Sequence, residues 1–324
     1  MSINLGVHVP IAGGLLEAVG RAKRLRCTTM QIFSRSPRGG KTLPIPRELA
    51  ERFDAQRRAA GLEPLAVHGP YIINLASPEA AVWKRSLALY RDDYARAAAL
   101  GARYLVTHVG SHRGQGEPGG IARVAEAVSR TLDGAAPTTM ILLENTAGSG
   151  QGLGYTFEQL AAIREAVPAK AHVGVCLDTA HLFAAGYPIQ TDEGLEQTLA
   201  AFDRAVGFAH LRLIHLNDSK APFNSRVDRH WHIGEGHIGR EAFRRIVTHP
   251  RLRGIPFILE TPKTTARPPG PPVAHAGAGG DSESRAGERE DRRNLATVRR
   301  LAQDGAGSRP NRLPRISRAQ LVAV

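Results

Sequence analysis

The chain has 324 residues, of which 42% are hydrophobic, so it is long enough for one large or two small domains with a sizeable core. Its two cysteines, Cys27 and Cys176, cannot form a disulfide framework, and no apolar run approaches the roughly 18 residues of a membrane span, so we expect a cytoplasmic protein. The formal net charge of +13, of which +8 lies in residues 1–264, favours a polyanionic partner such as nucleic acid.

Eight short apolar segments alternate with stretches of helical periodicity up to residue 260. The expected strands are residues 3–9, 28–33, 65–68, 104–109, 140–144, 172–178, 211–216 and 257–260. The expected helices between them are residues 15–25, 46–60, 79–100, 121–132, 156–167, 195–206 and 240–248. This rhythm predicts a single (β/α)8 TIM barrel. A doubly wound sheet would need a phosphate-binding fingerprint, and residues 148–152 lack the Lys and Ser/Thr of a P-loop.

The composition changes after Glu260. Residues 264–290 are rich in Pro, Gly, Ala and Ser without an apolar period, which is typical of a flexible linker or insertion. Residues 291–302 carry Leu295, Val298 and Leu301 at helical spacing and are expected to supply the eighth helix. The catalytic domain should therefore span residues 1–302, and residues 303–324 are expected to form a disordered basic tail.

Imidazoles and carboxylates stand at, or just after, the ends of six predicted strands. They are His68, His108, Glu144, Asp178, His181, His215, Asp228, His230 and Glu260. In a barrel these strand ends meet at one mouth, where nine such groups would be costly without cations. Mixed His and carboxylate ligands suit Zn²⁺, and nine exceed the needs of one ion, so we expect two or three metals. Taken singly, each has a simpler explanation: Asp178-x-x-His181, for example, is also the pattern of a helix cap.

Sequence blocks spread over residues 6–262 resemble the endonuclease IV family of apurinic/apyrimidinic endonucleases. They are GVHVPIAGGL, VHGPYIINLASP, THVGSH, LLENTAGSGQGLGYTFEQL, GVCLDTAHLFAAGY, IHLNDSKAPFNSRVDRHWHIGEGHIG and FILETP. The resemblance implies a barrel with three zinc ions that cleaves the phosphodiester 5′ to an abasic nucleotide, leaving a 3′-hydroxyl and a 5′-deoxyribose phosphate. It also implies a 3′-phosphodiesterase side activity on 3′-blocked ends, and it leaves open whether Mn²⁺ occupies some of the sites.

By position in these blocks, the nine candidate ligands divide among three ions. The sets are His68 and His108 with a bridging Glu144, then Asp178, His215 and Glu260, and lastly His181, Asp228 and His230. The resemblance implies that a hydroxide between the first two ions attacks phosphorus in line, while the third ion stabilises the leaving oxygen. Glu144 and Glu260 are the carboxylates that we assign to the catalytic centre.

Six residues are candidates for contacts with double-stranded DNA: Arg38, Tyr71, Ile72, Lys220, Arg226 and Arg229. The resemblance implies that the abasic nucleotide is flipped out of the stack, so side chains must fill the gap. Tyr71 and Ile72 resemble the family's wedge residues, with Ile where Leu is expected, and loop packing is the alternative. Arg38 resembles the family's inserted arginine, although its loop is short. The three basic residues near position 225 either contact phosphates or form a solvated basic face.

Two other functions remain open. The same barrel serves metal-dependent sugar isomerases and epimerases, which need one or two ions and acid/base groups around a polyol. A non-catalytic DNA-binding protein is the third class. The set of His181, Asp228 and His230 and the pair Tyr71–Ile72 favour the nuclease, and unused buried ligands would be costly in a non-catalytic protein. We expect the nuclease to act as a monomer.

Overall fold

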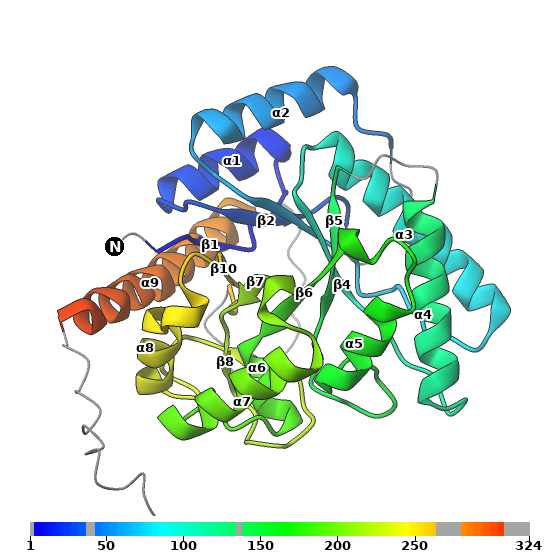
Figure 1. Ribbon diagram of the computed structural model, residues 1–324. Coiled ribbons are helices and arrows are strands. Elements are labelled where there is room, and N and C mark those ends of the chain that lie inside the picture. Colours follow the sequence, from blue (N-terminus) through cyan, green and yellow to red (C-terminus); the bar gives the residue numbers. More distant parts are fainter. Residues whose placement is uncertain (1–2, 37–42, 134–137, 264–279, 308–324) are drawn as a thin grey trace, which may run out of the picture.

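The computed structural model describes residues 3–36, 43–133, 138–263 and 280–307, and within them eight parallel strands form a barrel surrounded by helices (Figure 1). The strands are β1 (Leu5–Val7), β2 (Met30–Phe33), β3 (Leu65–His68), β4 (Tyr104–His108), β5 (Met140–Glu144), β6 (Val173–Asp178), β7 (Leu211–His215) and β10 (Phe257–Leu259). They pair in the order β1-β10-β7-β6-β5-β4-β3-β2. A parallel bridge between His8 and Gln31 brings β1 and β2 together, so the predicted TIM barrel is confirmed.

The helices that we expected between the strands are present to within a few residues at each end. The helices are α1 (Leu15–Arg24), α2 (Arg47–Ala59), α3 (Ala80–Ala99), α4 (Glu117–Leu132), α5 (Phe157–Glu165), α6 (Thr179–Ala185), α7 (Asp192–Ala205), α8 (Arg240–Thr248) and α9 (Gly280–Gly307). Short 3-10 turns cover Lys170–His172, Phe208–His210 and Pro250–Leu252. Sequence analysis did not predict α6. Among the described helices, none is both long and apolar enough to cross a membrane.

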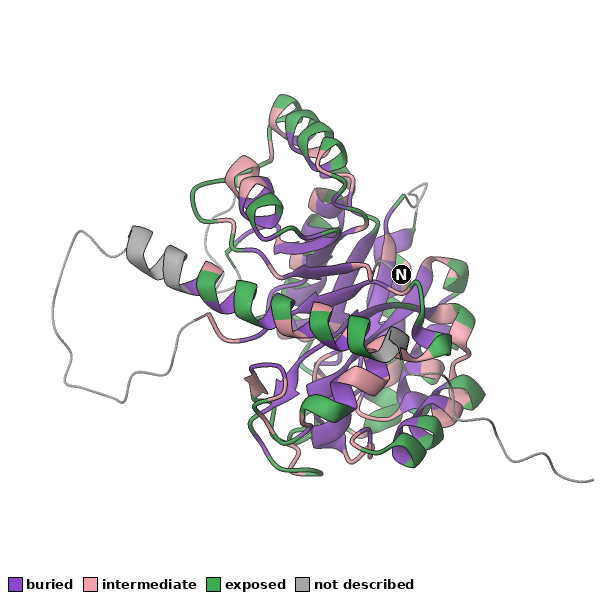
Figure 2. Ribbon diagram, turned by 90° about the vertical axis from the view of Figure 1, so that its left-hand side faces the viewer, coloured by how far each residue is buried: buried purple, intermediate pink, exposed green. Residues whose placement is uncertain are grey.

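Two apolar layers hold the barrel together. A small cluster fills its interior and consists of Ala66, Tyr104, Val106, Leu142, Cys176, Leu213 and Ile258. A much larger cluster packs the strands against the inner faces of the helices, which is visible as the buried strands and helix faces in Figure 2. Polar groups at the carboxyl ends of the strands therefore sit above a dry, close-packed floor.

The last helix differs from the prediction. We expected a linker over residues 264–290, but α9 already begins at Gly280, so the expectation was wrong for residues 280–290. The tail was expected from residue 303, yet α9 continues to Gly307. Residues 264–279 and 308–324 lie outside the described residues.

Charged contacts explain why an apolar pattern missed the start of α9. Glu288 forms a 2.7 Å ion pair with Arg24 on α1, and Asp291 forms an ion pair with Lys263 after β10. These pairs hold a turn of helix that carries no apolar stripe. Further along, Leu295, Val298 and Leu301 are buried against the barrel, as their spacing predicted.

Candidate metal centre at the barrel mouth

The register of the barrel brings the predicted ligands to one level. His108 lies opposite Glu144 in the ladder between β4 and β5, and Asp178 lies opposite His215 between β6 and β7. These are the last residues of their strands, so the side chains meet at the carboxyl end of the barrel. His68 ends β3 in the same way.

Glu144 is the centre of the buried part of this site. Its Oε2 atom lies 3.1 Å from Nε2 of His68 and 3.2 Å from Nε2 of His108. Its Oε1 atom lies 2.9 Å from Nδ1 of His215. Burial alone would raise the pKa of Glu144, but the surrounding imidazoles, His108 first, hold it well below its usual range. Glu144 is therefore an anion with both oxygens directed at imidazole nitrogens.

The remaining predicted ligands complete a continuous cluster. Asp228 lies 3.2 Å from Nε2 of His181 through Oδ2 and 3.4 Å from Nε2 of His230 through Oδ1. His230 Nε2 is also 3.5 Å from Oδ2 of Asp178. Glu260 closes the ring, with Oε2 placed 3.3 Å from Nδ1 of His215. Ligand atoms lie within 4.8 Å of one another in three groups: His68, Glu144 and His215; Asp178, His181 and His230; and Glu144, Asp178, His215 and Glu260.

Four of these histidines are oriented by an oxygen on the far side of the ring. The pairs are His68 Nδ1 with Gly69 O at 2.7 Å, His181 Nδ1 with Asn145 O at 2.9 Å, His215 Nε2 with Gln31 Oε1 at 2.9 Å, and His230 Nδ1 with Glu260 O at 3.3 Å. Each far nitrogen must donate to its oxygen, so the near nitrogen of the neutral ring presents a lone pair to the carboxylates. Such an arrangement of acceptors facing acceptors fits a cation between them.

Two buried atoms point to the same cation sites. The Nε2 atoms of His181 and His230 have no hydrogen-bond partner within the described part of the chain. Without a metal, protons take the place of the cations: burial lowers the pKa of His181, but Asp178 and Asp228 outweigh it and raise the pKa to about 10. The pKa of His215 is likewise raised well above its ordinary value, because its interactions with the Cys176 sulfur and with the carboxylates of Glu260 and Glu144 outweigh burial.

Asp178 is both a helix cap and a member of the cluster. It is the N-cap of α6, with Oδ1 accepting a 2.9 Å hydrogen bond from the backbone N–H of His181. Its other oxygen, Oδ2, faces the imidazole of His230 and accepts a 2.7 Å bond from Nδ2 of Asn217. The cap fixes the carboxylate and leaves one oxygen toward the cluster.

Several supporting residues were not among the predicted site residues. Asn217 donates to Asp178, and its Oδ1 accepts a 2.7 Å bond from the backbone N–H of Glu260. Asn145 accepts a 2.6 Å bond from the backbone N–H of Asp178. Gln31 contacts His215 and Glu260 from β2. The sequence signal that could have identified them is a polar residue beside a candidate ligand, as for Asn145 and Asn217, or a single polar residue in an apolar strand, as for Gln31.

Asp218 fixes the start of the loop that carries Asp228 and His230 and the segment that follows it. An antiparallel ladder of two residue pairs joins β8 (Asp218–Ser219) to β9 (His230–Trp231). The buried Asp218 carboxylate accepts hydrogen bonds of 2.8–3.0 Å from the backbone N–H groups of Ser219, Gly234, Gly236 and Ile238. A Cβ atom at Gly236 would lie 2.5 Å from Asp218 Oδ1, so the close approach requires glycine.

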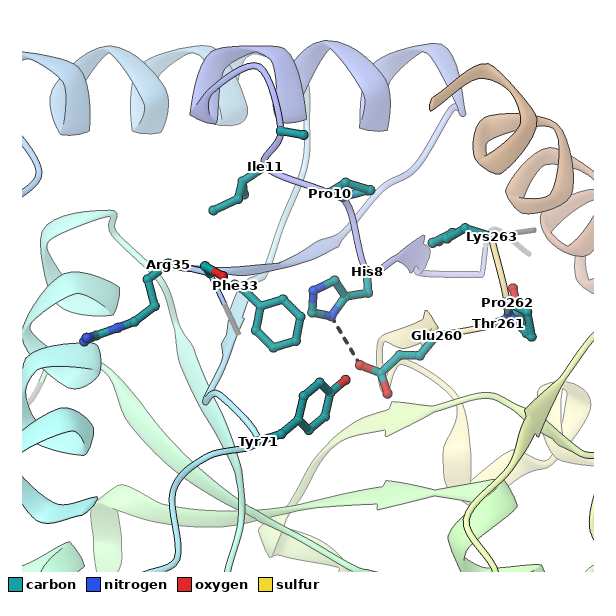
Figure 3. Close-up of a pocket in the computed structure, with 12 residues that line it drawn as sticks. His8, Pro10, Ile11, Phe33, Arg35, Tyr71, Glu260, Thr261, Pro262 and Lys263 are labelled. Atoms are coloured by element: carbon teal, nitrogen blue, oxygen red, sulfur yellow. Dashed lines mark hydrogen bonds and ion pairs between the residues drawn. The ribbon is translucent and has the colours of Figure 1, made fainter. Parts of the chain in front are cut away.

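The candidate wedge residues stand exposed beside the cluster. Tyr71 is 69% exposed and Ile72 is 48% exposed. The Tyr71 ring lies 5.6 Å from that of Phe33 and 6.1 Å from that of His68. Figure 3 shows Tyr71, Phe33, His8 and Glu260 close together in the lining of a pocket of about 470 Å³. An exposed aromatic side chain thus stands at the edge of the mouth.

The basic candidates lie in the loop after β7. Lys220 and Arg229 are exposed, and Nζ of Lys220 lies 4.2 Å above the ring of Trp231. Arg226 is half-buried with its guanidinium 4.5 Å from the ring of Tyr155. The side chains of Lys220 and Arg226 are therefore each positioned by an aromatic ring. Arg38 lies outside the described residues.

Comparison with known proteins places this site in a class. The family model described as "Xylose isomerase-like TIM barrel" matches residues 19–281. A protein of Chloroflexus aurantiacus named "Probable endonuclease 4" is 44% identical over 92% of this chain and 98% of its own. The crystal structure of endonuclease IV from Thermus thermophilus is 36% identical, with a TM-score of 0.77, over 93% of this chain and 99% of that one. The chain therefore belongs to the endonuclease IV family.

More distant structures share the barrel alone. D-Psicose 3-epimerase from Clostridium cellulolyticum is 16% identical, with a TM-score of 0.60, over 93% of this chain and 99% of that one. At that level of identity only the fold is common. The sugar-epimerase alternative thus has no support beyond the barrel itself.

Proposed function

We propose that the barrel mouth holds three metal ions, with the nine predicted ligands divided as their positions suggest, and that it cleaves DNA on the 5′ side of an abasic nucleotide. As a member of the endonuclease IV family, the protein is an apurinic/apyrimidinic endonuclease. The 3′-hydroxyl and 5′-deoxyribose phosphate products, action on 3′-blocked ends, and a monomeric, cytoplasmic enzyme belong to the same proposal.

The orientation of the histidines carries the proposal. In His68, His181, His215 and His230, one ring nitrogen donates to a protein oxygen and the other faces a carboxylate. This pattern is the one that metal-binding histidines use to fix their tautomer. The mixture of imidazole and carboxylate donors favours Zn²⁺, and Mn²⁺ at one of the sites is an alternative.

The chain's own residues define how a phosphodiester approaches. Glu144 and His215 are buried at the base, whereas the side chains of His108 and Asp228 are 30% and 49% exposed. The substrate therefore enters between the loop bearing Tyr71 and the loop bearing Asp228. Zn²⁺ at these positions would act as a Lewis acid that activates water and neutralises the phosphate. Exposed Tyr71 and Ile72 are placed to occupy the space beside the abasic nucleotide.

Incision of a duplex oligonucleotide with one tetrahydrofuran abasic analogue tests the proposal. The assay is run with magnesium chelated and compares the wild-type protein with Glu144→Gln. We expect a single cut 5′ to the analogue that leaves a 3′-hydroxyl, with the rate falling at least about 10²- to 10³-fold in the variant. Glu158→Gln, at an exposed position on α5, is the matched control and should cut normally.

The metal content of the same preparations tests the number of ions. Elemental analysis of the wild-type protein should give three zinc ions per chain. If zinc-loaded, folded wild-type protein leaves the duplex intact, the endonuclease is excluded. A content of one ion would refute the three-site arrangement.

A further inference from the structure

Gln31 is a buried polar side chain in the middle of an apolar strand. It belongs to β2, has no exposed surface, and lies at the bridge where β2 meets β1. Its Oε1 atom is 2.9 Å from Nε2 of His215. Its Nε2 atom is 2.6 Å from Oε1 of Glu260 and 2.9 Å from Nδ1 of His8. One amide thus reaches side chains at the ends of three other strands.

The neighbours determine which way round this amide lies. As a carboxylate ligand, Glu260 can only accept hydrogen bonds, and its Oε1 atom lies 2.6 Å from the Gln31 amide. The Gln31 NH₂ group must therefore face Glu260, because the opposite orientation would place two acceptor oxygens 2.6 Å apart. The carbonyl oxygen is then left to face His215.

That orientation fixes both neighbours. Since Gln31 Oε1 only accepts, Nε2 of His215 must carry its hydrogen, and Nδ1 has the lone pair. On the other side, Gln31 holds Oε1 of Glu260, so Oε2 is the oxygen directed 3.3 Å from His215 Nδ1. Glu144 Oε1 lies 2.9 Å from the same nitrogen. Three acceptor atoms therefore converge on one point.

We propose that Gln31 is a positioning residue for the metal centre: it sets the His215 tautomer and turns the Glu260 carboxylate so that both present an acceptor to one cation. The inference rests on the proposed function only in taking His215 and Glu260 as ligands. Gln31 contacts Nε2 of His215 and Oε1 of Glu260, which are the atoms that face away from the cation. Its loss should therefore loosen one ion without emptying the other positions.

Outer partners of metal ligands typically contribute about 10- to 100-fold in metal affinity. We expect Gln31→Met, which has similar size but neither hydrogen-bonding group, to weaken one zinc ion by that factor. Gln31→Asn keeps an amide but is one methylene shorter, so it cannot span His215 and Glu260, and it should weaken the same ion. Gln159→Met is the matched control: Gln159 is also a buried glutamine, but it lies on α5 and accepts from the backbone N–H of Gly154.

The measurement is release of zinc from the full-length, zinc-loaded protein to a chromophoric chelator, with circular dichroism to verify the fold. The inference is supported if one zinc ion leaves about 10- to 100-fold faster from folded Gln31→Met and Gln31→Asn than from wild type and Gln159→Met. Recovery of incision by the Gln31 variants on addition of Zn²⁺ would further show that Gln31 orients the ligands rather than only packing the barrel.

Zinc release at the wild-type rate from both Gln31 variants would overturn the inference, whatever their incision rates. The inference would also be overturned if Gln159→Met lost zinc as fast as the Gln31 variants, because a general loosening of the fold would then explain the effect. Failure of the proposed function is distinguishable, since it would appear as wild-type protein that retains zinc and leaves the abasic duplex intact.

Discussion

The candidate metal centre has two parts that are built differently. Glu144, His68 and His215 stand on barrel strands and are almost completely buried. Asp228 and His230 stand on the loop after β7, and the Asp228 side chain is 49% exposed. The strand-borne part takes its geometry from the parallel register, which cannot shift without breaking the barrel. The loop-borne part is held by the two residue pairs between β8 and β9, and hydrogen bonds to Asp218 hold the segment that follows it.

The comparison shows that removing chemically similar groups can lower the free energy of unfolding by very different amounts, depending on whether a strand or a loop carries them. When an anion enclosed by imidazoles in a dry site is removed, water cannot take its place beside them. A half-exposed carboxylate is already partly solvated, so its removal is less costly.

The largest contrast should appear in the metal-free protein. Glu144→Gln removes the anion that pairs with buried imidazoles and should lower the free energy of unfolding by about 3–5 kcal/mol. Asp228→Asn removes a half-exposed carboxylate that is partly solvated, so the loss should be smaller. Urea denaturation in the presence of a strong chelator, followed by circular dichroism, measures both. Equal losses in the two variants would show that the strand-borne part has no special stability.

Removing the support of the loop should have the next largest effect. Asp218→Ala leaves several buried N–H groups without an acceptor, so we expect a loss of about 3 kcal/mol. Hydrogen exchange should accelerate at the amides of Gly234, Gly236 and Ile238, while the amides of β5 and β6 stay protected. Thr198→Ala is a control, since the buried Thr198 hydroxyl donates a local hydrogen bond to the Gly194 carbonyl. Uniform acceleration across the barrel would contradict an independent loop.

Sequence analysis found the barrel and the candidate ligands because both leave a direct pattern. Apolar strands at regular intervals predict the fold, and each ligand of the strand-borne part is the last residue of its strand. By contrast, α6 was missed because all seven of its residues are buried, so it has no polar face to give a helical period.

The supporting residues escaped for a different reason. Asp218 acts on backbone groups up to twenty residues away, and Gln31 acts on His215 across the barrel. Such contacts form only when the barrel closes and the loop folds back onto Asp218. They connect residues that are distant in sequence, so no local periodicity predicts them. A lone glutamine in MQIF indicates only that something polar must lie opposite.

Proton release should accompany metal binding. The pKa of His181 is raised to about 10, so the metal-free protein holds a proton there at pH 8, and the pKa of His215 is also raised well above its ordinary value. Zinc needs the lone pair of His181, so loading at pH 8 should release at least about one proton per chain. Calorimetric titration in buffers of different ionisation enthalpy counts the protons released.

The sign of the pH dependence follows from the same raised pKa values. In the folded, metal-free protein, the charged imidazole of His181 contributes stability that is complete below pH 6.5 and is lost as the pH rises through about 10. Zinc affinity should rise over that interval, since protons compete less. Absence of buffer-dependent heat at pH 8 would mean that these histidines are already neutral.

The smallest effect concerns the basic residues of the exposed loop. Lys220→Ala should weaken binding of abasic duplex and reduce the slope of log affinity against log salt by about 1, if Lys220 contacts one phosphate. Its ammonium group lies over Trp231, which positions the charge without neutralising it. Lys23→Ala on α1, also exposed, is the control and should leave the slope unchanged. An unchanged slope in Lys220→Ala would mean that this face is only solvated, and that the loop serves the site through Asp228 and His230 rather than through its charge.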